Sequence, residues 1–100
     1  MEINKQHFFL KLIPPRPTFA MDMTQDERNI MMQHVAYWTE LMNRNIAIVF
    51  GPVMDPNGVY GIGVVEVNSE EEVNVLIEND PANGLNKYEK FAMQAVTKSN

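Results

Sequence analysis

The sequence contains no cysteine and few basic residues. Without cysteine the chain can have no disulfide framework, no thiol nucleophile and no cysteine-ligated metal. Lys and Arg total 8 against 13 Asp and Glu, which gives a formal net charge of −5, and the basic residues are scattered along the chain. Binding to a nucleic-acid backbone needs clustered cations. The composition therefore predicts that nucleic acid is not a partner.

Long hydrophobic runs are also missing. No apolar run approaches the roughly 18 residues that a membrane-spanning helix requires. The apolar stretch 8–13 is too short for the core of a signal peptide and is followed by Pro14 and Pro15. We therefore expect no membrane partner and a cytoplasmic location. The 2 histidines and the scattered acids show no metal-ligand spacing, so we expect no metal and no cofactor.

What the chain does contain is enough apolar material for one small core. It has 100 residues, of which 45% are hydrophobic and 21% are charged. This length and composition predict a single globular domain over residues 1–100.

The hydrophobic periodicity predicts four strands and two helices. The strands are expected at 7–13, 46–53, 59–67 and 88–96, and the helices at 24–44 and from Ser69 to the Asp80-Pro81 pair. Thr24 and Ser69 each precede a glutamate by three residues, which predicts a capping box at both helix starts. The proline-rich segment from Pro14 to Met23 is expected to be a loop.

The order β-α-β-β-α-β predicts an α+β, ferredoxin-like fold with a four-stranded antiparallel sheet and both helices on one face. The other face of such a sheet should be polar if it meets water. Strand 46–53, however, is apolar on both faces, with Ile46, Ile48 and Phe50 on one and Ala47 and Val49 on the other. At roughly 25 cal/mol per Å², an uncovered second face would forgo several kcal/mol. We therefore expect a homodimer or higher homo-oligomer that packs sheet to sheet, with another ligand or protein as the alternative cover.

A sheet of this kind can also bind RNA by stacking bases on exposed aromatic residues. Phe8, Phe9 and Tyr60 are available for stacking, but the basic, glycine-interleaved signature is absent and strand 59–67 carries a glutamate instead. The residues therefore argue against the RNA-binding interpretation.

The two histidines occupy different environments in the predicted structure. His7 lies at the start of the first strand, where a solvated strand-end residue is the simpler interpretation. His34 lies mid-helix in an apolar row with Ile30, Tyr37 and Leu41. Spacing alone leaves open whether His34 is a hydrogen-bonded core residue or a catalytic one.

A pattern spread over most of the chain resembles the YCII-related proteins of the dimeric α/β-barrel superfamily. Its parts, in order, are an apolar first strand, the helix segment HVAYW at 34–38, the strand end GPVMD at 51–55, the helix start SEE at 69–71, then Asp80-Pro81 and Gly84-Leu85. The resemblance implies a ferredoxin-like protomer that pairs sheet to sheet.

The resemblance also implies a His-Asp active-site pair, carried over here to His34 and Asp55. A carboxylate on one imidazole nitrogen fixes the tautomer, and the other nitrogen acts as general base or acid. The candidates for substrate binding around this pair are Arg16, as an anion contact, with Tyr37, Trp38 and Pro52. For Arg16 a solvated side chain is the alternative.

The expected function is that of a small enzyme acting on a small organic molecule in a cleft, by elimination, isomerisation or hydrolysis. The resemblance includes a family branch of dehydrochlorinases that act on chlorinated hydroxyquinols. The alternative is a non-catalytic binding or accessory module on the same dimeric scaffold. The PPRP loop and Ala82-Asn83 depart from the family pattern, which leaves the substrate class open.

Overall fold

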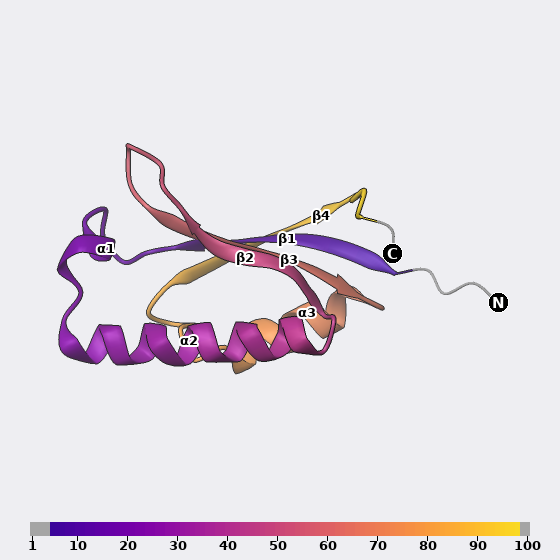
Figure 1. The fold of residues 1–100 in the computed structure, drawn as a ribbon, viewed down its shortest axis with the longest axis horizontal. Helices are drawn as coiled ribbons and strands as arrows, with labels where there is room; N and C mark the ends of the chain where they lie inside the picture. The colour runs from indigo at the N-terminus through magenta and orange to yellow at the C-terminus, as the bar shows by residue number, and fades with distance from the viewer. Residues whose placement is uncertain (1–4, 99–100) are drawn as a thin grey trace.

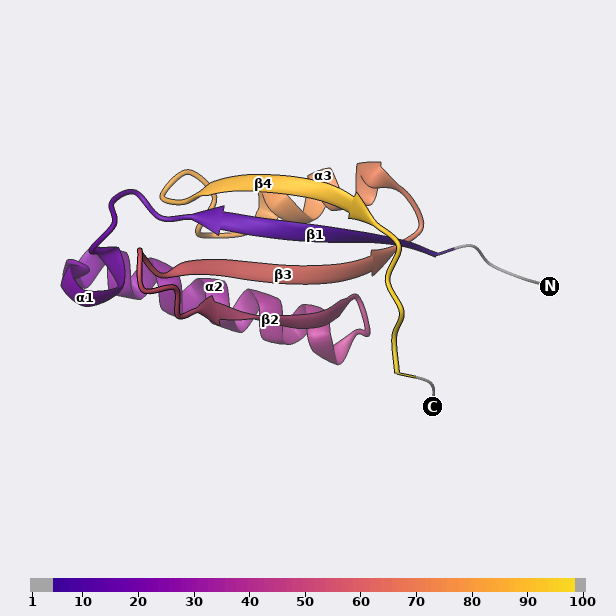
Figure 2. The ribbon, with the colours of Figure 1, turned by 90° about the horizontal axis from the view of Figure 1, so that it is seen from above.

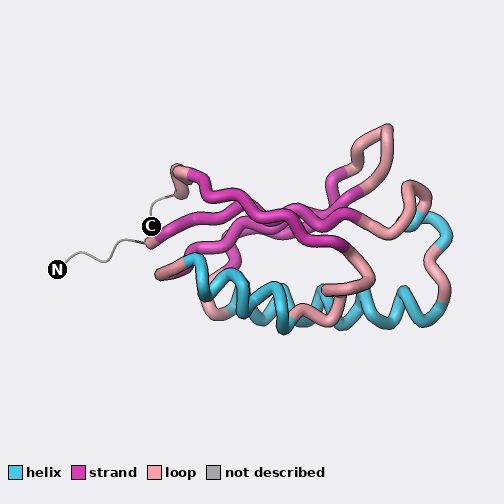
Figure 3. Tube along the Cα trace, turned by 180° about the vertical axis from the view of Figure 1, so that it is seen from behind, coloured by secondary structure: helices cyan, strands magenta, loops and turns pink. Residues whose placement is uncertain are grey.

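The computed structural model describes residues 5–98 and contains four strands and three helices. In chain order these are β1 (Gln6–Ile13), α1 (Phe19–Asp22), α2 (Gln25–Asn43), β2 (Ala47–Val53), β3 (Tyr60–Val67), α3 (Glu70–Asn79) and β4 (Lys87–Met93). The long helix α2 and the shorter α3 both lie on one side of the sheet (Figure 1). Seen from behind, α2 and α3 again lie on that same side, while the short α1 lies beyond one end of the sheet (Figure 3).

The sheet has the strand order β2-β3-β1-β4, and every neighbouring pair is antiparallel. The order is visible from above, with the helices behind the strands (Figure 2). This is the topology of the ferredoxin-like fold, so the predicted fold class is confirmed. Within residues 5–98, no helix has the length and apolar character needed to cross a membrane.

The predicted capping box is complete at the start of α2 and incomplete at the start of α3. At α2 the Thr24 side chain accepts the Glu27 N–H and the Glu27 carboxylate accepts the Thr24 N–H, so this capping box is complete. At α3 Ser69 accepts the Glu72 N–H, but the Glu72 carboxylate accepts the N–H of Asn68. The second predicted box is therefore only half formed.

The sequence predicted a loop for the whole segment after β1, but part of this segment is helical. Residues 19–22 form the single helical turn α1, which buries the Phe19 ring. The last strand is also shorter than predicted, since β4 ends at Met93.

The core lies between the helices and the covered face of the sheet. Its most completely buried large side chains are Trp38, Leu10, Leu41, Val65 and Val73. A Cβ atom on Gly63 of β3 would lie 2.5 Å from Cη2 of the Trp38 ring. Only glycine therefore lets the indole pack directly against the strand.

A bulge in β2 changes which side chains share a face of the strand, so the predicted assignment of side chains to the two faces is wrong. Ala47 pairs with Val65, but Val49 pairs with Val64, so the register shifts between them. Ala47 consequently faces the helices and is buried, whereas Val49 lies on the open face. A strict alternation of side chains cannot anticipate an inserted residue.

The open face of the sheet carries a continuous apolar row across all four strands. Val49, Val64, Phe9 and Phe91 are successive neighbours in the strand register. The Phe9 and Phe91 rings lie 6.3 Å apart, and Phe91 remains 51% exposed. The prediction that apolar side chains lie on the second face is confirmed for this row.

Candidate functional site

His34 projects from the middle of α2 and is paired with a buried carboxylate. Its Nδ1 atom lies 2.8 Å from Oδ2 and 3.0 Å from Oδ1 of Asp80. The Asp80 side chain has no solvent exposure, and the His34 side chain retains 11%. A buried ion or ion pair needs further hydrogen bonds to offset its lost hydration.

Asp80 receives those further hydrogen bonds from three other donors. Its Oδ2 accepts from Trp38 Nε1 at 3.1 Å and from the Tyr88 hydroxyl, and its Oδ1 accepts the Ala82 N–H at 2.8 Å. Burial alone would raise the pKa of Asp80. The hydrogen bonds from His34, Tyr88 and Ala82 outweigh burial, and the net result is a lowered pKa. Asp80 is therefore an ionised carboxylate inside the fold.

The ionised carboxylate fixes the protonation pattern of its neighbours. Burial and the charge of Asp80 raise the pKa of the Tyr88 phenol, so Tyr88 stays protonated and donates. A carboxylate only accepts hydrogen bonds. The Nδ1 atom of His34 must therefore carry a proton, which leaves Nε2 as the acceptor in the neutral ring.

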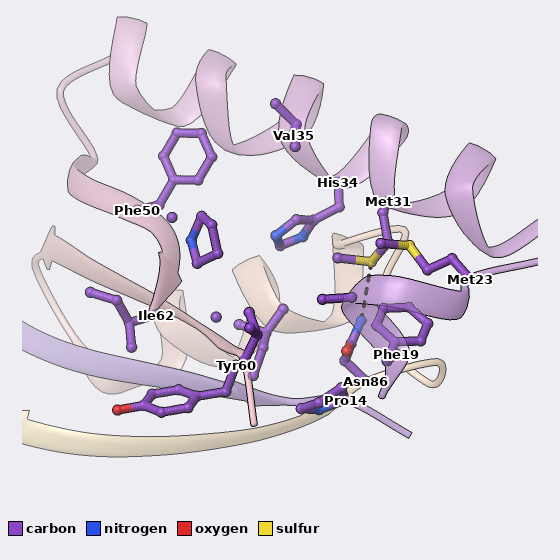
Figure 4. A pocket seen from close by; sticks show the side chains of 16 residues that line it. Pro14, Phe19, Met23, Met31, His34, Val35, Phe50, Tyr60, Ile62 and Asn86 are labelled. Atoms are coloured by element: carbon purple, nitrogen blue, oxygen red, sulfur yellow. Dashed lines mark hydrogen bonds between the residues drawn. The ribbon is translucent and has the colours of Figure 1, made fainter. Parts of the chain in front are cut away.

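The Nε2 side of His34 borders a cavity of about 260 Å³ between α2, α1 and the β2–β3 end of the sheet. The walls are mostly apolar and are drawn in Figure 4, where the imidazole lies between Phe50 and Met31. Within residues 5–98, every fully buried side-chain nitrogen or oxygen has a hydrogen-bond partner. Nε2 has none among these residues, so it is not sealed and opens into the cavity.

The carboxylate that His34 contacts is not the one predicted. Asp55 lies beyond the end of β2, in the turn to β3, where its Oδ1 accepts the Asn57 N–H at 2.8 Å. Asp55 thus stabilises its own turn, as aspartate often does. The predicted His34–Asp55 contact is wrong, because the Asp80 carboxylate occupies Nδ1.

Arg16 is held by carboxylates and is not a free cation. It donates to both carboxylate oxygens of Glu27, at 3.0 and 2.8 Å, and to Oδ1 and the carbonyl oxygen of Asp22. The hydrogen bonds from Arg16 are the main reason why the pKa of Glu27 falls to about 2. The clamp ties α1 to the start of α2, and Phe19, Ala20 and Met23 then form one end of the cavity.

The remaining predicted binding residues fall in three different places. Pro52 lines the cavity. Trp38 is 2% exposed and contacts Asp80 from the core side, outside the cavity lining. Tyr37 donates to the carbonyl oxygen of Leu76 at 2.7 Å, which joins α2 to α3. Trp38 and Tyr37 therefore hold the surrounding elements in place and do not line the cavity.

Sequence reasoning missed Asp80, Tyr88 and Asn86 as parts of the site. One signal was available for Asp80, which follows α3 as its C-terminal cap. A negative charge is unfavourable at the negative end of a helix dipole, so an aspartate there calls for another function. Asn86 and Tyr88 carried no such signal, because both follow an irregular segment.

The described residues hold no group of three or more His, Cys, Asp or Glu side chains that could bind a metal ion. The polar side chains at the cavity are instead those of His34, Asn86 and Tyr60, and the Asn86 amide donates to Met31 Sδ at 3.3 Å. The arrangement suits proton transfer to or from a small molecule.

The antiparallel βαββαβ sheet and the histidine on its longer helix define an α+β protein of the ferredoxin-like class. Within that class the chain belongs to the YCII-related domain family, which it matches over residues 7–94. The match covers all four strands and all three helices.

One solved structure with the same fold is 5-chloro-2-hydroxyhydroquinone dehydrochlorinase (TftG) from Burkholderia phenoliruptrix AC1100, in complex with 2,5-dihydroxybenzoquinone. The similarity covers 91% of this chain and 95% of that chain, with a TM-score of 0.61 and 22% sequence identity. No curated protein matches the chain. At 22% sequence identity the structural similarity establishes the fold alone.

Proposed function

We propose that this protein is a small-molecule enzyme in which His34 Nε2 takes up and returns a proton. The observation that carries the proposal is the geometry at His34, with Nδ1 held by the buried Asp80 carboxylate at 2.8 Å and Nε2 open to an apolar cavity. Asp80 orients the ring and fixes a proton on Nδ1. A positioned general base or acid of this kind contributes about 10² to 10⁴ in rate.

Among the described residues, no Ser, Thr, Cys or Lys side chain borders the cavity. Proton transfer within the substrate, as in elimination or isomerisation, is therefore the chemistry we favour. In an elimination, Nε2 would remove a proton from the substrate, the released electron pair would form a double bond, and a leaving group such as chloride would depart with its bonding electrons. The histidine would then lose its proton to water. The dehydrochlorinase activity of the structural neighbour supports this reaction class.

The ¹⁵N resonances of the histidine rings at pH 7 test the proposal. We expect the proton on Nδ1 of His34 in the native protein and in Asp55→Asn, and a less strictly fixed tautomer in Asp80→Asn, since the Asp80 carboxylate accepts from Nδ1. The two variants remove one carboxylate each and serve as matched controls. A native His34 ring with its proton on Nε2 would leave the cavity without a base, and the protein would then be a binding or accessory module.

We also propose that a second copy of the chain covers the open face of the sheet. The apolar row of Val49, Val64, Phe9 and Phe91 supports this proposal, because an exposed apolar surface of this kind favours association. Analytical ultracentrifugation should show a dimer for the native protein and a monomer for Val49→Asp. Val75→Asp on α3 is the matched control, since Val75 is similarly exposed but lies outside the sheet. A native monomer at high micromolar concentration would contradict the proposal.

A further inference from the structure

The cavity restricts the chemical class of substrate more tightly than the reaction type does. Resting on the function proposed above, we infer that the site selects an uncharged molecule of about one substituted ring that presents a hydroxyl group to His34, and that it rejects carboxylates and phosphates. The size of the cavity, the charges around it and its hydrogen-bonding groups each support one part of this conclusion.

The size of the cavity sets the scale of the ligand. An apolar cavity of about 150 Å³ holds a benzene molecule, and the cavity beside His34 has about 260 Å³. The space therefore suits one ring with a few substituents. Phe50, Phe19 and Met31 supply aromatic and sulfur surfaces around it (Figure 4), and such surfaces favour a planar apolar ligand.

The charges around the cavity oppose an anionic ligand. Among the described residues, no Lys, Arg, Asp or Glu side chain lines the cavity. Behind His34 lies the ionised Asp80, so the site is negative whenever the imidazole is neutral. The nearby loop offers no free cation, because Arg16 is paired with both Asp22 and Glu27. An anion entering this cavity would lose its hydration and gain no cationic partner while His34 is neutral.

Tyr60 does not change this balance, although it borders the cavity. The Tyr60 ring belongs to the open face of the sheet, where the Lys11 ammonium lies 4.6 Å from the ring centroid. The Tyr60 hydroxyl points away from His34 in Figure 4. The phenol and the Lys11 charge are therefore directed toward the open face.

The hydrogen-bonding capacity of the cavity determines which polar group the ligand carries. With its proton on Nδ1, neutral His34 presents Nε2 as an acceptor. A bound ligand must bring a donor to this atom, or the acceptor loses its water without replacement. A ring hydroxyl satisfies Nε2 and also supplies the proton that a general base removes. The reaction and the recognition then depend on the same hydrogen bond.

Binding of two chlorinated probes at pH 7 tests the inference. 4-Chlorophenol is neutral at this pH and 4-chlorobenzoate is ionised, while the two are similar in size. Measured by protein-observed NMR, 4-chlorophenol should bind at least about tenfold more tightly, a difference of about 1.4 kcal/mol. It should also shift the ¹⁵N resonance of His34 Nε2, as a hydrogen bond to that atom requires.

A cavity-blocking variant locates the binding site. Val35 borders the cavity and is 50% exposed, whereas Val75 on α3 is 52% exposed and lies outside it. Val35→Trp should abolish 4-chlorophenol binding, and Val75→Trp should retain it. If Val35→Trp fails to fold, contacts between the probe protons and the Met31 methyl group in the native protein locate the ligand instead.

Three results would overturn the inference: equal or tighter binding of 4-chlorobenzoate, phenol binding that leaves the Nε2 resonance unmoved, or no binding of 4-chlorophenol at millimolar concentration. None of these results decides the proposed acid-base role. That role depends on which nitrogen of His34 carries the proton in the native protein and in Asp80→Asn, so the two failures are distinguishable.

Discussion

The protein contains two histidine–carboxylate pairs of nearly the same length in very different surroundings. On the open face, His7 Nε2 lies 2.9 Å from Glu66 Oε2, and the Glu66 side chain is 34% exposed. Under the sheet, His34 Nδ1 lies 2.8 Å from Asp80 Oδ2, and the Asp80 side chain has no exposure. The two distances alone would not distinguish a site from a surface contact.

The difference lies in what surrounds each carboxylate. Asp80 accepts from Trp38, Tyr88 and the Ala82 N–H in addition to His34, whereas the structure gives Glu66 no other side-chain partner within residues 5–98. His34 also has a cavity beside its free nitrogen. His7 was predicted to be solvated, but only 15% of its side chain is exposed. Glu66, the residue opposite His7 on the neighbouring strand β3, partly covers it.

The largest expected difference between the pairs is in catalysis. In the proposed acid-base role, turnover of a substrate identified by activity screening should fall by about 10² to 10⁴ in His34→Gln, since the general base is lost. His7→Gln should stay within about threefold of the native rate. The measurement is kcat and KM for each variant, with the loss in kcat expected to dominate. Equal losses in the two variants would remove the distinction between the pairs.

The next largest effect should be on stability. Asp80→Asn should lower the free energy of unfolding by about 2–4 kcal/mol, because one partner of a buried pair is replaced and several donors lose a charged acceptor. Glu66→Gln should cost less than about 1 kcal/mol, as for an exposed pair. Urea denaturation of both variants at pH 7 measures the difference. Similar losses would mean that burial does not separate the two carboxylates.

A smaller loss should follow from disturbing Trp38, which supports only the buried pair. Gly63→Ala places a Cβ 2.5 Å from Trp38 Cη2 and should cost about 1–3 kcal/mol through overpacking. Gly61→Ala is the matched control, since its Cβ would meet Leu12 Cβ at an ordinary 3.4 Å. Thermal denaturation compares the two variants. A Gly61→Ala variant as unstable as Gly63→Ala would contradict the proposed close approach.

The smallest effect is the dependence of the buried pair on pH. The pKa of Asp80 is lowered in the folded state, so its contribution to stability is complete above the unfolded value of about 3.9 and is lost as the pH falls through the lowered value. The gap in unfolding free energy between native protein and Asp80→Asn should therefore narrow as the pH falls below the unfolded value of about 3.9. Denaturant midpoints at several pH values provide the measurement, with Asp55→Asn as the control. A constant gap would show that Asp80 is not preferentially ionised in the fold.

Much of the fold was accessible from local patterns. Thr24 and Glu27 marked the start of α2, and Asn45, which adopts a left-handed conformation with φ of 63°, follows its end. The β2 bulge was not accessible, because either face of an apolar strand satisfies the same pattern. The half-formed cap at Ser69 was equally hidden, since Glu72 has Asn68 as a second nearby donor.

The candidate site was predicted in part, and the error came from its long-range component. Of the two aspartates, Asp55 follows the strand β2 and Asp80 follows the helix α3. The preference for Asp55 rested on resemblance, while the unfavourable charge at the end of α3 pointed to Asp80. The helical turn α1 was missed because a proline-rich segment gives no periodic signal for a single turn.

By itself, the sequence determined the order of the elements, most of their boundaries and the position of His34 on the covered face of α2. These properties follow from backbone periodicity and caps that act over a few residues. Only the tertiary structure decided that Asp80, 46 residues away, meets His34, and that α1 closes an apolar cavity beside it. Such contacts depend on how α3 and the loop before α2 dock on the same core, and that docking is set by packing between distant segments.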